Sequence, residues 1–355
     1  EEARRMAQEV DAVIVVGGRD SGNTKRLASI ARSIGTPTVH VETEEELEEK
    51  WLSPYDCFAI TAGASTPNWM IERVVERVEK HLQLRGQGWR SGLHQALEFF
   101  VKSNVYTALG AATLSYASCR LQGIEPNFLF HFIACFYVFA MHLLNQFTDA
   151  EAIRLNEPTR SAFYERYKTV LVSMGIVSGL GSILLALRFG VLTFLVILLA
   201  SALGIAYRVK LVPAGWSPPV RFRSLKDIPA SKDVFVTLGW ATATVILPIF
   251  SFKELGLSMA TVTAFVFVSV LVFVRSVLRD LKDMQGDMIL GRETIPTIVG
   301  PVGTRAMLVL LLFFLMGELL TAEARGWTTD LSHYLLIPTM YSGICLWCFQ
   351  SKAIR

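Results

Sequence analysis

The chain has 355 residues, of which 52% are hydrophobic and 18% charged, and its 34 basic and 31 acidic side chains give a formal net charge of +3. Soluble proteins carry about 25% charged residues, so this composition argues against an ordinary soluble enzyme. The small net charge argues against a nucleic-acid-binding protein, and the five cysteines are too few for a disulfide-stapled scaffold.

Charge is distributed unevenly along the chain. Residues 1–80 are charge-rich, whereas residues 100–350 are mostly apolar with short charged interruptions. This contrast predicts a soluble lobe over residues 1–84, a linker with an amphipathic helix over residues 85–103, and a transmembrane domain over residues 104–355. The first residue is Glu rather than Met, so we expect either that the chain begins inside a longer product or that its start is disordered.

Short apolar runs alternate with helical patterns in the soluble lobe. Strand-like runs cover residues 11–16, 38–41 and 57–61, and helical spacing covers residues 24–34, 44–52 and 67–82, the second of these with Thr43 as its cap. Strands that alternate with helices at this spacing predict a small α/β lobe with a parallel sheet. About 80 residues is little for such a fold, so we expect one lobe of something larger.

Two loops follow predicted strands and lead into predicted helices. They cover residues 17–24 and 61–67 and are rich in glycine and hydroxyl residues. Exposed backbone N–H groups at a helix N-terminus suit a phosphate. Loops of this composition also occur simply because the chain must turn tightly, and both interpretations stay open.

The runs VDAVIVVGGRDSGNTKRLASIA, TPTVHVETEEELEEKWL and FAITAGASTPNWMIERVV resemble the carboxyl-terminal lobe of the IspH (LytB) family over residues 1–80. Members of that family are 4-hydroxy-3-methylbut-2-enyl diphosphate reductases that use an iron–sulfur cluster. The resemblance implies that Ser21, Asn23 and Ser65 bind a substrate diphosphate, while Gly22 stands where the family often has a second serine.

The same resemblance limits what this lobe does alone. The three cluster cysteines of the family lie upstream of the matching region, and Cys57 does not match a ligand position. An iron–sulfur cluster is therefore expected only if an upstream cysteine-bearing region exists. Otherwise the lobe is a relic that is kept for structure.

Eight apolar stretches of roughly membrane-spanning length follow the lobe. They cover residues 104–121, 128–144, 170–187, 191–207, 234–249, 258–274, 306–320 and 331–348. We expect eight transmembrane helices, or nine if another follows residue 355. The loops after the second, fourth and sixth stretches are rich in Lys and Arg, which predicts that these loops and the soluble lobe are cytoplasmic. We expect an integral protein of a bacterial inner membrane.

A group of aspartates ends the sixth stretch. Asp280, Asp283 and Asp287 are spaced i, i+3 and i+7, so they share one face of a helix. An ionised Asp costs about 2.5–3.5 kcal/mol at a bilayer centre, and like charges repel unless a cation lies between them. Hard divalent cations prefer carboxylate oxygens, and Mg²⁺ is typically shared with substrate phosphates. The spacing therefore favours a magnesium and diphosphate site.

A second polar group follows the second stretch. Asn145 and Asp149 are spaced i and i+4, and Glu151 is close by. Each polar group alone is more typical of a solvated helix end. Together they follow helices that lie four apart in the chain, which is the pattern of an internal repeat that builds one site between two halves.

The two groups resemble the paired Asp-rich motifs of the UbiA superfamily of intramembrane prenyltransferases, over about residues 90–355. The first motif of the family, Asn-Asp-x-x-Asp-x-x-x-Asp, matches at Asn145 and Asp149, with Gln146 and Ile153 in place of two aspartates. The second motif is intact and is followed by the run of residues 291–294 that the family also has.

This resemblance implies magnesium-dependent transfer of a prenyl group from a polyprenyl diphosphate to an aromatic, quinone-precursor or polyol acceptor. Tyr207 is expected to stabilise an allylic cation or to orient the acceptor, although a tyrosine there also suits a membrane interface. The expected Mg²⁺ ligands are Asn145, Asp149, Asp280, Asp283 and Asp287. The expected diphosphate contacts are Arg208, Lys226, Lys232 and Arg279. Each of them is also explained as one of the basic residues that mark the cytoplasmic side of the membrane.

The expected partners are a polyprenyl diphosphate, a small lipophilic acceptor and membrane lipids, with no nucleic acid. The oligomeric state stays open. Two alternatives to a simple transferase also stay open. The first is a bifunctional protein that carries reductase activity as well, and the second is a non-catalytic membrane scaffold with a degenerate site.

Overall fold

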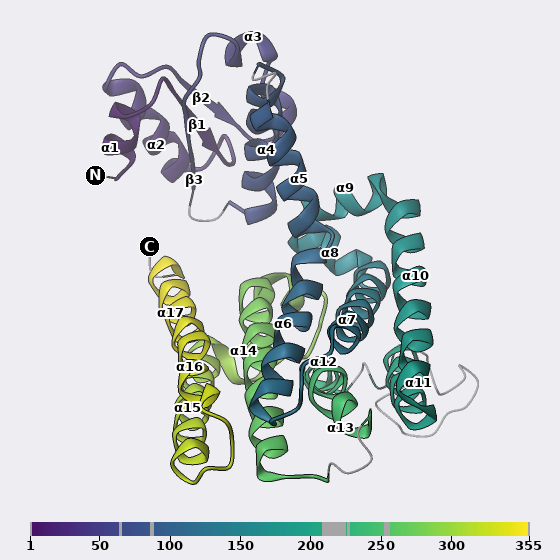
Figure 1. The fold of residues 1–355 in the computed structure, drawn as a ribbon. Coiled ribbons are helices and arrows are strands. Elements are labelled where there is room, and N and C mark those ends of the chain that lie inside the picture. The colour runs from purple at the N-terminus through teal and green to yellow at the C-terminus, as the bar shows by residue number, and fades with distance from the viewer. Residues whose placement is uncertain are drawn as a thin grey trace, which may run out of the picture. The chain divides into compact units, whose positions relative to one another are not determined.

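The computed structural model describes residues 2–63, 66–85, 89–207, 225, 228–251 and 256–353 (Figure 1). Contacts within the chain divide it into two compact units. The first unit consists of Glu1–Lys102 and Asp149–Tyr167, and the second consists of Ser103–Thr148 and Lys168–Arg355. The domain boundaries at residues 84 and 103 stay a prediction.

A three-stranded parallel sheet forms the centre of the first unit (Figure 1). Its strands are β1 (Ala12–Val16), β2 (Thr38–Val41) and β3 (Phe58–Ala62), in the order β2-β1-β3. All five residues of β1 are buried, because successive side chains enter two hydrophobic clusters on opposite faces of the sheet. The three predicted strands are therefore present, each within one residue of its predicted position.

Three helices of the first unit pack against this sheet, α1 (Glu2–Gln8), α2 (Gly22–Ser33) and α4 (Asn68–Arg85). The helix α5 (Trp89–Lys102) follows α4 in the same unit. The predicted helix over residues 24–34 corresponds to α2, and the one over residues 67–82 corresponds to α4. The amphipathic helix expected in the linker corresponds to α5.

The single acidic helix predicted over residues 44–52 is wrong. The segment forms a 3-10 turn, η1 (Glu44–Glu46), and a one-turn helix, α3 (Glu49–Leu52), with extended backbone at Leu47 between them. Leu47 and Leu52 are both 1% exposed. Residues five apart do not share a face of one straight helix, so the break lets both leucines enter the core. Thr43 makes no side-chain cap bond.

Two further helices of the first unit lie in the segment after α7, where the sequence predicted a charged loop. They are α8 (Ala150–Asn156) and α9 (Pro158–Arg166), and Pro158 opens α9, where a missing N–H group costs nothing. The helix α4 packs against both of them. The first unit is therefore discontinuous in sequence.

The second unit is a helical bundle (Figure 1). Each of the eight predicted apolar stretches coincides with helical structure. The helices are α6 (Val105–Leu121), α7 (Phe128–Thr148), α10 (Lys168–Ala186), α11 (Val191–Ala206), α12 (Ser231–Ala241), α13 (Leu247–Ser251), α14 (Met259–Ile289), α15 (Ile295–Ala324), α16 (Leu331–Tyr334) and α17 (Leu336–Ala353).

Five helical segments of the described chain are long and apolar enough to cross a membrane. They are Phe128–Thr148, Lys168–Phe189, Ser231–Phe250, Met259–Ile289 and Ile295–Ala324. The segment Ser231–Phe250 is continuous because a π-helical turn, η4 (Thr242–Ile246), joins α12 to α13. The helix α11 is apolar but has 16 residues, and the predicted total of eight or nine crossings stays a prediction.

Apolar side chains lie on both the inside and the outside of the bundle. Phe130, Leu143, Phe267 and Leu308 are fully buried where helices pack, whereas the outer face of α10 exposes a run of aliphatic residues. In water such a surface would favour aggregation, but in a bilayer it is the expected lipid contact. The second unit is therefore built as an integral membrane domain.

Candidate functional site

The last turns of α14 carry the aspartates of the intact motif. Asp280 is 2% exposed and Asp287 is 4% exposed, while Asp283 is half-buried. All three lie on one continuous helix, as their spacing predicts. Two carboxylates are thus removed from solvent at one end of the bundle, which is costly unless positive charge or hydrogen-bond donors face them.

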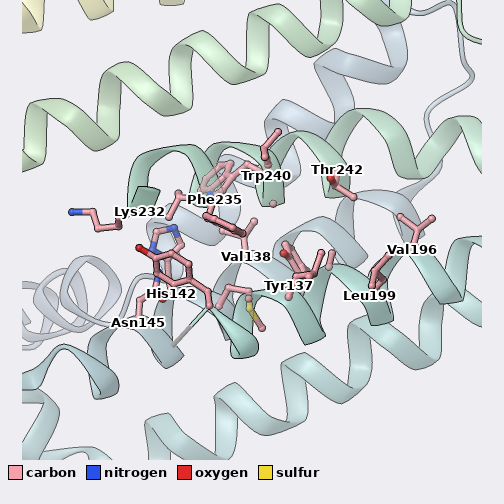
Figure 2. Close-up of a pocket in the computed structure, with 18 residues that line it drawn as sticks. Tyr137, Val138, His142, Asn145, Val196, Leu199, Lys232, Phe235, Trp240 and Thr242 are labelled. Carbon is pink, nitrogen blue, oxygen red and sulfur yellow. The ribbon is translucent and has the colours of Figure 1, made fainter. Parts of the chain in front are cut away.

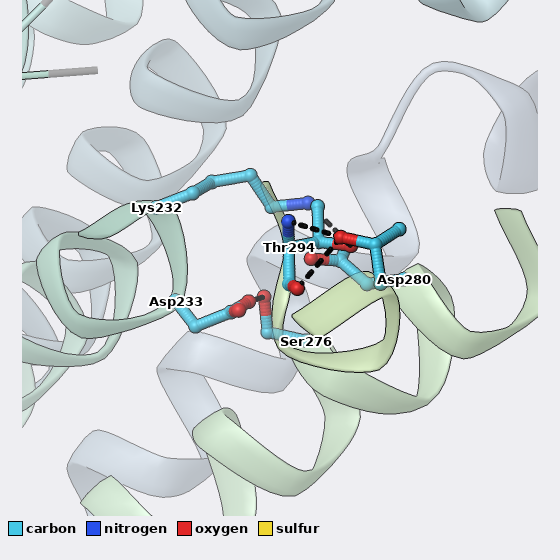
Figure 3. A network of polar contacts seen from close by, with 6 residues as sticks. Lys232, Asp233, Ser276, Asp280 and Thr294 are labelled. Carbon is cyan, nitrogen blue, oxygen red and sulfur yellow. Dashed lines mark hydrogen bonds and ion pairs between the residues drawn. The ribbon is translucent and has the colours of Figure 1, made fainter. Parts of the chain in front are cut away.

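The first turn of α12 provides some of these partners. Lys232 Nζ forms an ion pair with Asp280 Oδ1, and the neighbouring Asp233 Oδ1 accepts a hydrogen bond from Ser276 Oγ at 2.5 Å (Figure 3). Ser276 and Asp280 lie one helical turn apart on α14, so two consecutive residues of α12 hold the two helices together. The side chain of Lys232 is 38% exposed, which leaves its ammonium group within reach of a ligand.

Asp233 is a site residue that the sequence analysis missed. It is fully buried, and it lies beside Lys232, which the analysis did name. The signal was present in the Lys-Asp pair that follows Pro229. Nothing in the local pattern indicated that Asp233 faces α14, because that depends on how α12 and α14 pack.

Two buried carboxylate oxygens, Asp233 Oδ2 and Asp280 Oδ2, have no hydrogen-bond partner within the described part of the chain. Native proteins rarely leave such oxygens unsatisfied, and each one indicates a ligand or a strained site. Carboxylate oxygens are the donors that Mg²⁺ prefers, so the chemistry of this group fits that ion.

The arrangement does not form a protein-only metal cage. Among the described residues, no group of three or more His, Cys, Asp or Glu side chains converges closely enough to hold a metal ion. Mg²⁺ is usually bound by one or two carboxylates together with substrate phosphates and water. The aspartates of α14 therefore fit a magnesium ion that is shared with a diphosphate.

A cavity of about 260 Å³ lies between α7, α11 and α12 (Figure 2). Most of its lining is apolar, and Val196 and Leu199 mark its apolar end in the view of Figure 2. Its other end is polar and contains Asn145 and Lys232. Because Lys232 is paired with Asp280, the polar end of the cavity adjoins the acidic face of α14.

Tyr207 also lines this cavity and is 6% exposed. Its hydroxyl group and Ser231 Oγ share a hydrogen bond at 3.0 Å, and its ring lies 4.8 Å from the ring of Phe235. Ser231 Oγ in turn lies 2.9 Å from Leu225 O, to which it donates. The ring is therefore held between α11 and α12 and faces the cavity, where it can meet a substrate.

Backbone hydrogen bonds join the start of α12 to the run that follows α14. Ala230 N donates to Glu293 O at 3.1 Å, and Arg292 N donates to Asp287 O at 2.9 Å. Ala230 adopts a left-handed conformation with φ of 58°, which turns the chain immediately before α12. These contacts position Lys232 and Asp287 in the same part of the site.

The cavity contains three aromatic side chains that the sequence analysis did not assign to the site, Tyr137, Phe235 and Trp240. His142 also lines it, with its ring 5.9 Å from that of Trp240. His142 precedes Asn145 by three residues and so lies on the same face of α7. That spacing was readable in the sequence, but the aromatic lining depends on which helices meet.

The remaining predicted residues fall into two groups. Asp149 immediately precedes α8 in the first unit, and Arg279 is half-buried on α14 in the second. Arg208, Lys226 and Ser65 lie outside the residues that the structure describes.

The two glycine-rich loops of the soluble lobe meet at the carboxyl ends of the strands. Gly63 N donates to Val16 O at 3.2 Å, and a side chain at Gly17 would approach Thr66 Oγ1 to 2.7 Å. Ser21 Oγ accepts from Thr24 N at 3.4 Å and so caps α2. Asn23 is exposed beside it. The predicted phosphate-binding loops are thus adjacent, although the roles of Ser21 and Asn23 stay predictions.

An ion pair joins the first of these loops, residues 17–24, to η1. Arg19 Nη2 bonds Glu46 Oε2 at 3.1 Å, and Arg19 N bonds Glu42 Oε1 at 2.5 Å. Burial raises the pKa of Glu46, but hydrogen bonds from Arg19 and from the N–H of Glu42 outweigh it and hold the pKa below its usual range. The guanidinium group of Arg19 is therefore engaged by a carboxylate within the lobe.

Comparison with known proteins gives two separate matches. Residues 1–79 match the family model described as LytB protein, and residues 104–353 match the one described as UbiA prenyltransferase family. The 4-hydroxy-3-methylbut-2-enyl diphosphate reductase of Syntrophotalea carbinolica is 53% identical over 77 residues, and that of Solidesulfovibrio magneticus is 52% identical over 81 residues. These regions are 22% and 23% of this chain, and the chain spans 28% of the length of each reductase.

A solved structure resembles the larger part of the chain. It is a UbiA homologue from Archaeoglobus fulgidus bound to GPP and Mg²⁺, with 12% sequence identity and a TM-score of 0.51 over 71% of this chain and 87% of that one. At this identity the similarity shows the fold. Both resemblances found in the sequence are confirmed, and so is the predicted class of a helical polytopic domain after a small α/β lobe.

Proposed function

The chain belongs to the UbiA prenyltransferase family, and on this premise we propose that it transfers a prenyl group from a polyprenyl diphosphate to a lipophilic acceptor inside the membrane. The observation that carries the proposal is the apolar cavity whose polar end contains Lys232, paired with Asp280. A donor with a charged head and a long hydrocarbon tail needs this combination of an apolar wall and a few convergent polar groups. The similar structure that was solved with GPP and Mg²⁺ supports the same class of donor.

The proposed ligands of Mg²⁺ are Asp280, Asp283 and Asp287 of α14, together with Asn145 and Asp149. When bound, the ion supplies positive charge that neutralises the diphosphate leaving group. Lys232 adds a second positive charge at the polar end of the cavity, and we assign Arg279, Arg208 and Lys226 to the same diphosphate.

The residues of the cavity act on the hydrocarbon part of the donor. The allylic C–O bond breaks with its electron pair leaving on the diphosphate, the acceptor attacks the resulting carbocation, and the acceptor loses a proton. The rings of Tyr207, Phe235 and Trp240 present π-faces that stabilise a cation, and the apolar walls exclude water that would otherwise trap it.

The protein is an integral membrane protein by family and by its apolar helices. We place it in a bacterial inner membrane, with the basic loops and the soluble lobe in the cytoplasm. The excess of Lys and Arg in alternate loops supports this orientation. The donor then reaches the site from the cytoplasmic face.

The decisive experiment uses the full chain in lipid nanodiscs with geranylgeranyl diphosphate and a panel of aromatic, quinone-precursor and polyol acceptors. Mg²⁺-dependent diphosphate release is expected in the wild type, and a loss of about 100-fold or more is expected in Asp280→Asn, because a group that faces developing charge is removed. Glu323→Gln is the matched control, since Glu323 contacts His333 on α16. A wild type that releases no diphosphate with any acceptor would favour the non-catalytic scaffold, and equal measurable rates in the wild type and Asp280→Asn would refute the role of Asp280.

A reductase activity is a second candidate, favoured by the 53% identity of the lobe to a reductase over 77 residues. The described residues hold no cluster of Cys, His, Asp or Glu suited to a metal, so any iron–sulfur cluster would need cysteines from elsewhere. Iron content of the natural full-length product, purified without oxygen, tests this candidate. A product without iron excludes it.

A further inference from the structure

The connection between α7 and α10 folds in an unusual way. These two helices pack against each other in the second unit, and helices that do so are commonly joined by short loops. Here the connection is the segment Asp149–Tyr167, which belongs to the first unit and forms α8 and α9 there. The soluble lobe is therefore completed by residues that leave and re-enter the membrane domain.

A cluster of three aromatic rings joins α9 to α5. The ring of Phe99 lies 5.6 Å from the rings of Phe163 and Tyr167, edge to face in both cases, and the rings of Phe163 and Tyr167 are 4.9 Å apart. Phe163 is 8% exposed and Tyr164 is 5% exposed. Aromatic pairs at these separations and angles stabilise beyond the area that they bury.

The contact of α4 with α8 and α9 is of a different kind. A cavity of about 400 Å³ separates part of these helices, and its lining is charged, with Arg73 and Arg77 on α4, Arg154 on α8 and Glu165 on α9. Solvated charges of mixed sign contribute little to stability. The aromatic cluster on α5 and the packing of α4 therefore hold α9, and with it α8, together.

The helix α8 begins directly after Asp149. Asp149 O accepts the first hydrogen bond of that helix, from Ile153 N at 3.1 Å, so the backbone of Asp149 moves with α8. One turn earlier in the chain, Asn145 lines the apolar cavity. The segment that carries Asn145 and Asp149 thus begins in the second unit and ends in the first.

We propose that the amino-terminal lobe serves as a positioning platform for prenyl transfer, in which the packing of α5 on α9 holds α8 and so fixes the conformation of the chain at Asp149. This inference rests on the proposed function, and it assigns the lobe a role that needs no reduction chemistry. Phe99 and Phe163 are positioning residues, since they act through Asp149.

The test uses the full chain in nanodiscs and the variant Phe163→Ala. Amide hydrogen exchange over residues 150–166 is expected to become about tenfold faster. In the wild type, local opening of α8 and α9 has to break the ring contacts of Phe163, and in the variant these contacts are absent. The Mg²⁺ concentration for half-maximal diphosphate release is expected to rise several-fold, with the rate at saturating Mg²⁺ largely kept. Phe163→Leu, which keeps an apolar side chain, is expected to restore most of both.

Phe58→Ala is the matched control, because Phe58 makes its ring contacts with Trp51 and Tyr55 in another part of the lobe. It is expected to change neither measurement. The proposal is overturned if Phe163→Ala leaves the Mg²⁺ dependence unchanged, or if Phe58→Ala shifts it equally. Tyr167→Leu decides by the same measurements if Phe163→Ala does not accumulate. A wild type without transferase activity would instead refute the proposed function, while the exchange data still report on the packing.

Discussion

At the scale of single residues, the ion pair between Lys232 and Asp280 has two consequences that can be separated. It compensates a carboxylate that is 2% exposed, and it places an ammonium group at the polar end of the cavity. The first consequence concerns stability and the second concerns substrate binding. A single substitution affects both, so the pair has to be studied with a double variant.

Lys232→Gln is expected to destabilise the protein and to raise the KM for the diphosphate donor. Breaking a buried pair by removing one partner costs about 3–5 kcal/mol, and the partial exposure of Lys232 should reduce this to about 1–3 kcal/mol. The double variant Lys232→Gln/Asp280→Asn is expected to recover most of the lost stability but none of the activity. Thermal unfolding in detergent and donor titrations measure the two effects, and a double variant no more stable than Lys232→Gln would contradict this account.

At the scale of helices, the close approach of α7 and α12 shapes the cavity. A side chain at Gly239 of α12 would lie 2.9 Å from the hydroxyl oxygen of Tyr137, which lines the cavity from α7. Tyr137 is a rigid ring that cannot yield as a flexible chain does. The absence of a side chain at position 239 therefore sets part of the width available to a substrate.

Gly239→Ala is expected to push the ring of Tyr137 into the cavity and to disfavour long donors. One methyl group in an apolar pocket typically changes discrimination by about 10–200-fold, so the ratio of kcat/KM for geranylgeranyl over geranyl diphosphate should fall by at least about tenfold. Gly317→Ala on α15 is the matched control, because nothing lies within 4 Å of a side chain there. An unchanged ratio in Gly239→Ala would show that this part of the cavity does not hold the tail.

At the scale of the whole molecule, α5 connects the lobe to the membrane domain and presents two faces. Leu93, Leu97 and Val101 are 51%, 53% and 58% exposed and follow one another at every fourth residue, so they form an apolar stripe. Phe99 lies on the opposite face, where it contacts α9. An exposed apolar stripe on an amphipathic helix is the pattern of a helix that lies in the bilayer interface.

An environment-sensitive fluorophore at Leu97→Cys is therefore expected to show blue-shifted emission in vesicles, while the same label at Gln95→Cys is not. Gln95 lies on the other side of the helix and is exposed. Both variants need a background in which the exposed Cys57 and Cys348 are replaced by Ser. Equal emission at the two positions would place α5 away from lipid.

Much of this architecture could be predicted from the sequence because the signals are local. Periodic apolar residues predicted the three strands and all eight apolar helical stretches, and the spacing of Asp280, Asp283 and Asp287 predicted their common face. The break at Leu47, the burial of Asp233 and the aromatic lining of the cavity were not predicted. Each of these depends on which segments pack together, and local periodicity carries no information about partners that are distant in the chain.

The first unit is formed by two separate stretches of the chain, and this has a consequence for biosynthesis. Residues 149–167 reach the lobe only after α6 and α7 have left the ribosome, so the lobe stays unfinished while these two helices are synthesised. Because the two pieces pack into one unit, they must end on the same side of the lipid, so the chain between them crosses the bilayer an even number of times or not at all. A nascent chain that left the two pieces on opposite sides of the membrane could not close its own amino-terminal fold.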